Sequence, residues 1–123
     1  MIAKHLQRGT AAEALAREWL EQRGLRFVEA NFRCKLGELD LIMMDGECLV
    51  VVEVRYRYRP SRGGPLASVT RAKQQKILRA ARLYLQRHRQ LRECPLRFDV
   101  LALQGPLDNA VADWRKRAFD ANS

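Results

Sequence analysis

The stretch that decides the fold of this chain is GELDLIMMDGECLVVVEVRYR, residues 37–57. Two runs of apolar and β-branched residues, 38–44 and 49–58, flank the dipeptide Asp45-Gly46. Asp-Gly between two such runs is a strong signal for a β-hairpin turn. The stretch therefore predicts two antiparallel strands.

The predicted hairpin brings two carboxylates to one face. Because side chains alternate along a strand, Asp40 shares a face with positions 38 and 42, and Glu53 shares one with positions 49, 51, 55 and 57. A turn made of Asp45-Gly46 alone pairs Asp40 with Val51, whereas a four-residue turn sets Asp40 opposite Glu53. Both registers place the two carboxylates on the same face, with β-carbons about 5 to 8 Å apart.

Two like charges this close need a compensating cation, and two interpretations remain open. A Mg²⁺ or Mn²⁺ ion could be held by both carboxylates together with water and a phosphate oxygen. Alternatively, Arg55 or Lys73 could form ion pairs with the carboxylates without any metal. Glu38 is expected to pair with an arginine of the facing strand rather than to bind metal.

The flanking sequence supplies the other elements of an α/β fold in the order α-β-β-β-α-β. Apolar residues recur at helical spacing over 10–23, and Gly24 is a plausible stop. A strand is expected over 25–32, and Thr70 is a suitable N-cap for a helix to about His88, with Lys73 on its apolar face. A strand over 96–103 could then lie parallel to the second hairpin strand.

The same pattern indicates one domain over 1–123. The Pro, Gly and Ser content of 59–69 predicts a flexible basic loop, and 104–123 is expected to be a C-terminal extension packed on the core. Glu13 lies at the margin of the first helix's apolar face, so it could lean over the sheet edge. It could equally be an exposed side chain that pairs with Arg17.

The net charge of +9 is unevenly distributed. Residues 1–53 carry seven Lys/Arg and nine Asp/Glu, residues 54–92 carry twelve Lys/Arg and no carboxylate, and residues 93–123 carry four and five. Clustered cations favour a polyanion such as DNA or RNA, because contacts with phosphates release counterions. A solvated helix face that keeps the protein soluble is the competing interpretation.

The composition, 47% hydrophobic and 30% charged, is typical of a soluble globular protein. No apolar run approaches the roughly 20 residues that span a bilayer, so no membrane partner is expected. The first residues lack the pattern of a secretory signal, and the three widely spaced cysteines favour neither a disulfide framework nor a zinc site. We expect a cytoplasmic location.

The sequence resembles the YraN family of bacterial proteins. The resemblance rests on GELDLI at 37–42 and VVEVRYR at 51–57, and it extends from Gly9 to Phe119 through short matches such as RFDV at 97–100. That family is similar to the PD-(D/E)XK nuclease-like group, which includes archaeal Holliday-junction resolvases. The resemblance implies a restriction-endonuclease-like mixed central sheet flanked by helices.

The resemblance also implies roles for individual residues. Asp40 and Glu53 would be metal ligands, with Glu13 as an outer or additional ligand. The group's Glu-X-Lys element is represented by Glu53-Val54-Arg55, and arginine cannot act as a general base because it stays protonated. Lys73 could supply the ammonium that this element lacks. The group's Pro-Asp signature is absent, because Leu39 precedes Asp40.

Two functions follow as hypotheses. The first is a Mg²⁺- or Mn²⁺-dependent endonuclease acting on DNA, which we prefer to RNA, with branched DNA among the candidate substrates. The second is a nucleic-acid-binding protein that keeps the fold without turnover. A homodimer is compatible with both. The expected catalytic residues are Asp40, Glu53, Arg55 and Lys73, and the expected nucleic-acid contacts are Arg57, Arg59, Arg62, Arg71 and Lys76.

Overall fold

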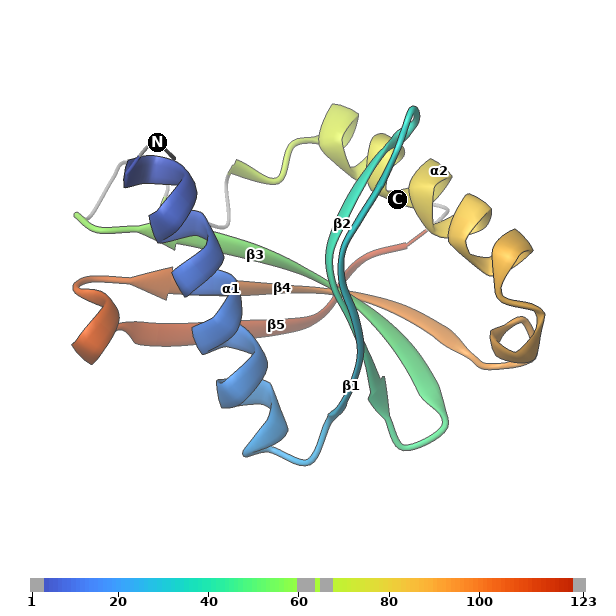
Figure 1. Cartoon of the computed structure of the whole chain (residues 1–123), viewed down its shortest axis with the longest axis horizontal. Coiled ribbons are helices and arrows are strands. Elements are labelled where there is room, and N and C mark those ends of the chain that lie inside the picture. The colour runs from blue at the N-terminus through green and yellow to red at the C-terminus, as the bar shows by residue number, and fades with distance from the viewer. Residues whose placement is uncertain (1–3, 60–63, 65–67, 121–123) are drawn as a thin grey trace.

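The computed structural model describes residues 4–59, 64 and 68–120. Two helices and five strands account for most of this part of the chain (Figure 1). The elements are α1 (Lys4–Glu21), β1 (Arg26–Cys34), β2 (Gly37–Asp45), β3 (Cys48–Arg57), α2 (Arg71–Arg87), β4 (Leu96–Gln104) and β5 (Val111–Phe119). Two short 3₁₀ turns, η2 (Arg89–Leu91) and η3 (Leu107–Asn109), precede β4 and β5.

The five strands form one mixed sheet in the order β1-β2-β3-β4-β5. The β3–β4 pair is parallel, as the sequence predicted, and the other three neighbouring pairs are antiparallel. In Figure 1, α1 crosses the face of β3, β4 and β5, and α2 lies beside β2. The predicted order is confirmed, and the α-β-β-β-α-β-β arrangement is that of a restriction-endonuclease-like fold.

Each face of the sheet carries its own apolar cluster. Ile77, Ala81 and Tyr84 of α2 pack with Val51 of β3 on one face. On the other face, the side chains of α1 pack with Val50, Val52 and Val54. The predicted alternation along β3 is therefore confirmed, and Glu53 lies on the face that α2 covers.

The β2–β3 turn falls one residue later than the predicted Asp45-Gly46. Asp45 pairs with Cys48, so the two turn residues are Gly46 and Glu47, and Gly46 takes the positive φ of 62° that a tight hairpin turn needs. The resulting register continues toward Asp40 opposite Glu53. This is the register that the sequence associated with a four-residue turn.

Both helices have clear end signals. Thr70 caps α2, accepting a hydrogen bond from the backbone N–H of Lys73 at 3.2 Å, as predicted. Gly24 follows α1 with φ 94°. The α1 helix begins at Lys4 and not at Thr10, because hydrogen bonding continues through Gly9 despite the low helix propensity of glycine.

The C-terminal segment contains a strand that its sequence does not reveal. β5 pairs with β4 and ends with Phe119, which stacks on Phe98 at 5.2 Å between ring centroids. The alternation of apolar and polar residues is broken by the run Arg115-Lys116-Arg117 at a register shift. We infer that β5 is stabilised by its pairing with β4 rather than by a regular alternation of apolar and polar side chains.

A fully buried carboxylate holds this register shift in place. Asp99 accepts two hydrogen bonds from the Arg97 guanidinium at 2.9 Å and one from the Trp114 indole N–H at 2.9 Å. It also accepts the backbone N–H of Arg117, a residue with φ 53°, at 3.1 Å. The second side of Arg97 pairs with Asp45 at 3.0 Å. This network joins β2, β4 and β5.

Most of the predicted basic loop over 59–69, including Arg62, lies outside the described residues. Neither helix, within the described part of the chain, is long and apolar enough to cross a membrane.

Candidate active site

Asp40 stands where the β2–β3 pairing ends. The regular register runs from Asp45 and Cys48 to Leu41 and Val52 and stops there. The Oδ2 atom of Asp40 then accepts a hydrogen bond from the backbone N–H of Val54 at 2.9 Å. A side-chain oxygen thus replaces the backbone acceptor that a continued ladder would provide, and it anchors Asp40 to the strand that carries Glu53.

The two carboxylates are both buried, with 8% of Asp40 and 3% of Glu53 exposed. Burial raises the pKa of Asp40, although the Val54 N–H and the charge of Arg55 oppose this shift. Burial and then the charge of Asp40 raise the pKa of Glu53 to about 8, against the opposing charges of Arg55 and Lys73. Direct contact between the two carboxyl groups is favourable only when one of them holds a proton.

Arg55 compensates only part of this charge. Its Nη2 atom donates to Oε1 of Glu53 at 3.0 Å. This is the ion pair that the sequence analysis gave as the alternative to a metal ion. The second oxygen, Oε2, is buried and has no hydrogen-bond partner within the described residues, and the same holds for Nε of Arg55. A buried carboxylate oxygen without a donor is costly, and either a proton shared with Asp40 or a further cation would satisfy it.

Glu13 lies on α1, which packs on the other face of the sheet, and its charge interacts with that of Asp40. Its burial and then the charge of Asp40 raise the pKa of Glu13 to about 7, and a hydrogen bond with Asn31 opposes the shift. The alternative partner Arg17 instead forms an ion pair with Glu21 at 3.4 Å. Within the described residues, no three His, Cys, Asp or Glu side chains are grouped to hold one ion, so Glu13 adds charge near the acidic pair rather than a third grouped ligand.

Two further expectations about charged side chains have different outcomes. Lys73 is exposed at the start of α2, but its charge still lowers the pKa of Glu53. Glu38 pairs with Arg33 at 3.4 Å, so its expected ion pair across the β2–β3 hairpin is wrong. The reason is that β2 has already left the β3 ladder at this position, whereas its pairing with β1 continues.

The solvent face of α2 is a row of cations that we call the basic face. It consists of five exposed residues: Arg71, Lys76, Arg79, Arg82 and Arg87. The helix contains no carboxylate, and no salt bridge within the described residues involves this face. At 1.5 Å per residue the row extends over about 25 Å. Arg79 and Arg82 were not among the predicted nucleic-acid contacts, although their helical spacing from Arg71 indicates that they share its face.

The nucleic-acid contacts expected of Arg57, Arg59 and Arg62 stay predictions. Arg57 and Arg59 are exposed, and Arg57 donates to the carbonyl of Tyr56 at 2.9 Å. They follow Glu53 along the chain, with Arg57 at the end of β3 and Arg59 just beyond it. The position of Arg62 lies outside the described residues.

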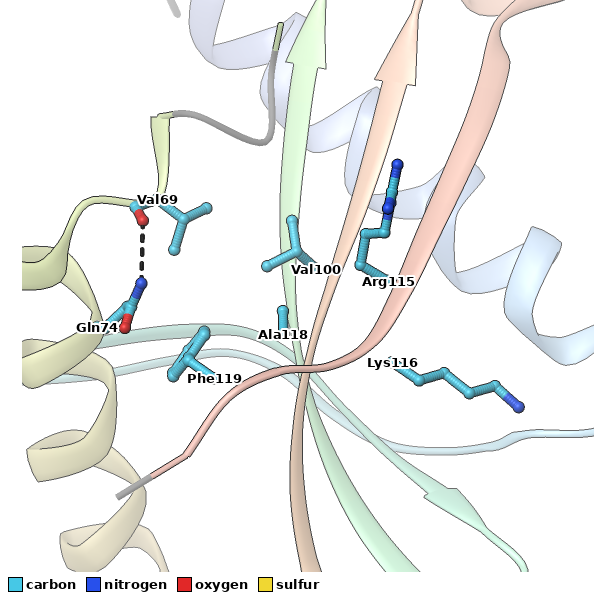
Figure 2. Close-up of a pocket in the computed structure, with 7 residues that line it drawn as sticks. All are labelled: Val69, Gln74, Val100, Arg115, Lys116, Ala118 and Phe119. Carbon is cyan, nitrogen blue, oxygen red and sulfur yellow. Dashed lines mark hydrogen bonds between the residues drawn. The ribbon is translucent and has the colours of Figure 1, made fainter. Parts of the chain in front are cut away.

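A cavity of about 340 Å³ lies between the start of α2 and strands β4 and β5 (Figure 2). Val100, which lines it, is the strand partner of Glu53 on one side and of Arg115 on the other. The other lining residues are Val69, Gln74, Lys116, Ala118 and Phe119. The sequence could not predict this cavity, because one wall is built by β5.

The chain is similar in sequence to a known family over most of its length. Residues 12–103 match the sequence model of "Uncharacterised protein family UPF0102". The chain is 47% identical over 113 residues to a "UPF0102 protein" of Stutzerimonas stutzeri (strain A1501), an alignment that covers 92% of this chain and 94% of that protein. It is 51% identical over 118 residues to "UPF0102 protein YraN" of Salmonella newport (strain SL254), covering 95% and 87%. The chain therefore belongs to the UPF0102 (YraN) family, which confirms the family that its motifs indicated.

Proposed function

We propose that this protein is a metal-dependent endonuclease that hydrolyses phosphodiester bonds in DNA. The observation that carries the proposal is the buried Oε2 atom of Glu53, which has no hydrogen-bond partner within the described residues and belongs to a carboxylate beside Asp40. A pair of buried carboxylates with an unsatisfied oxygen is suited to a hard divalent cation. The basic face of α2 suits a polyanionic substrate.

The donor set fits Mg²⁺ or Mn²⁺. Asp40 and Glu53 would hold the ion, and the negative charge of Glu13 would support it from α1. Such ions bind few protein carboxylates and complete their coordination with water and substrate phosphate oxygens, so a cluster of three acidic side chains is not required. A divalent ion at this position would neutralise phosphate charge and lower the pKa of a water molecule.

Arg55 and Lys73 supply the remaining positive charge. The guanidinium of Arg55 stays protonated, so it cannot remove a proton from water. It already holds Oε1 of Glu53 at 3.0 Å, which orients that carboxylate, and it can stabilise the negative charge that develops on a phosphate. Lys73 at the start of α2 acts on Glu53 through its charge and can contact the same phosphate.

The basic face would hold the nucleic-acid backbone on either side of the cleaved bond. Its cations are exposed and are not used in salt bridges within the described residues, so they remain available for phosphate. Arg57 and Arg59 extend the positive surface beyond the end of β3. These contacts would be independent of sequence, because phosphates carry no base information.

A second function, DNA binding without turnover, is favoured by one observation. The 3.0 Å contact between Arg55 and Glu53 already neutralises part of the acidic pair and occupies the position at which the nuclease-like group has a lysine. In that case DNA would bind on the same basic face, and the pair would serve to hold β2 and β3 together.

Cleavage assays separate the two functions. Purified protein would be incubated with linear, single-stranded and four-way-junction DNA in Mg²⁺ or Mn²⁺, with EDTA as the control. We expect cleavage that is lost in Asp40→Asn and in Glu53→Gln, both of which keep the side-chain size. Activity that survives in both variants would indicate a contaminating nuclease, and DNA binding without any cleavage would support the non-catalytic function.

A further inference from the structure

A cavity with apolar walls and cations at its margin lies one strand away from the acidic pair. Glu53 on β3 pairs with Val100 on β4, and Val100 pairs with Arg115 on β5. Glu53, Val100 and Arg115 thus follow one another across the sheet, with neighbouring strands about 4.8 Å apart. The distance from Glu53 to Arg115 along this row is therefore about 10 Å between backbones.

The walls of this cavity are suited to a flat apolar group. Val69, Val100 and Phe119 are each less than 10% exposed, and Figure 2 shows their side chains around the cavity. A volume of about 340 Å³ lies at the lower end of the range for small-ligand pockets. A fully apolar ligand would not use the polar groups that are also present.

Those polar groups are suited to the edge of a base and to a phosphate. Gln74 donates its Nε2 to the carbonyl of Val69 at 3.3 Å, which fixes the amide at the cavity wall and leaves its oxygen able to accept. Arg115 lies at the margin, where Asp113 holds Nε and Nη2 at 3.0 and 3.1 Å, and its Nη1 can still donate. The ammonium of Lys116 lies 4.5 Å from the centroid of the Trp114 ring, so the aliphatic part of this side chain is what lines the cavity.

We propose that this cavity binds an unpaired nucleobase of the DNA whose backbone lies at Asp40 and Glu53. The proposal rests on the proposed function and narrows its substrate class to DNA with a single-stranded or extruded nucleotide beside the cleaved bond. A base in a continuous duplex is stacked on both sides and cannot enter the cavity without leaving the stack. The base would gain contact with the apolar walls while Arg115 stays near its phosphate.

The experiment measures whether the affinity for a single strand depends on the presence of one base. A single-stranded oligodeoxynucleotide carrying one 2-aminopurine would be compared with the same oligonucleotide carrying an abasic residue at that position. Binding would be measured by titration in EDTA, so that no cleavage occurs. We expect the abasic strand to bind the unaltered protein about tenfold more weakly, because one stacked base contributes an effect of this order.

Two variants assign the effect to the cavity. Ala118 is exposed and lines the cavity, so Ala118→Trp fills the space without adding a large side chain to the core. Ala11 is equally exposed on α1, and Ala11→Trp is the matched control. We expect Ala118→Trp to bind the two strands equally and Ala11→Trp to keep the tenfold difference. Gln74→Ala, which removes the amide from the cavity wall, is expected to reduce the difference.

The outcomes distinguish this proposal from the proposed function. Equal affinity of the unaltered protein for the two strands, or a difference that persists in a folded Ala118→Trp variant, would overturn the nucleobase cavity even if DNA is cleaved. A base-dependent difference in a protein that cleaves no DNA would overturn the hydrolytic function and leave the cavity as proposed. Thermal unfolding of each variant would show that it is folded.

Discussion

The side chain of Asp40 accepts the backbone N–H of Val54 at 2.9 Å, a bond between two strands at the point where their regular ladder has ended. This bond gives Asp40 a structural role in addition to its proposed role as a ligand. Asparagine keeps a carbonyl oxygen that can accept the Val54 N–H, whereas alanine leaves that donor buried without a partner. Comparing Asp40→Asn with Asp40→Ala therefore separates the hydrogen bond to Val54 from the proposed role of the carboxylate as a metal ligand.

Asp40→Ala is expected to be less stable than Asp40→Asn by about 1–3 kcal/mol, the cost of an unsatisfied buried donor. Urea unfolding measured for both variants in EDTA would give this difference. Both variants should lose Mg²⁺-dependent cleavage. Equal stabilities for the two variants would show that the Val54 N–H does not depend on Asp40.

The stability of the metal-free protein is expected to fall as the pH rises from about 4.5 to about 8. Unfolding returns the pKa of Glu53 from about 8 to its ordinary 4.5, so in this range the folded protein holds a proton that the unfolded chain releases. Thermal unfolding would be followed over this range in EDTA. Glu53→Gln should flatten the dependence, whereas Glu13→Gln should remove only the part below the Glu13 pKa of about 7. A stability that increases over this range would contradict the raised pKa values.

Replacing Arg55 is expected to lower cleavage without weakening DNA binding. Arg55→Ala removes the cation that donates to Glu53 at 3.0 Å, and a loss of roughly 10²-fold in rate is expected for one donor at a developing charge. Arg55→Lys keeps the charge and should lose less. Single-turnover rates would be measured beside DNA affinity in EDTA. A rate that is unchanged in Arg55→Ala would exclude Arg55 from the reaction.

The basic face of α2 is expected to determine the salt dependence of DNA binding. Arg79→Gln should reduce the slope of the logarithm of affinity against the logarithm of salt concentration by about 0.9 for duplex DNA, if this side chain contacts one phosphate. Arg26→Gln on β1, also an exposed arginine, is the charge-matched control. Binding would be titrated at several salt concentrations. Equal slopes for Arg79→Gln and Arg26→Gln would mean that DNA does not lie on α2.

Asp99→Asn is expected to destabilise the fold by about 3–5 kcal/mol. The carboxylate is fully buried and accepts bonds from Arg97, Trp114 and Arg117. An amide there leaves the Arg97 guanidinium, whose side chain is 10% exposed, without its full counter-charge. Asp113→Asn disrupts an exposed pair with Arg115 and should change stability by less than about 1 kcal/mol. Urea unfolding of the two variants is the measurement, and similar losses in both would contradict a structural role for the Asp99 network.

The local features of this protein can be predicted from its amino-acid sequence. The Asp-Gly dipeptide indicated the hairpin, Thr70 indicated the start of α2, and alternation along the second hairpin strand placed Glu53 on the same face as Val51. These features are readable because each depends on residues a few positions apart, for which side-chain periodicity and capping chemistry are sufficient.

The relative positions of these features depend on tertiary contacts. In the folded protein the turn lies at Gly46 and Glu47, and the side chain of Asp40 accepts the backbone N–H of Val54. Strand β5 pairs with β4 and forms one wall of a cavity. None of these could be inferred from local pattern, because each depends on partners distant in the chain. The cost of an unsatisfied buried polar group selects those partners, and it acts only once the sheet has assembled.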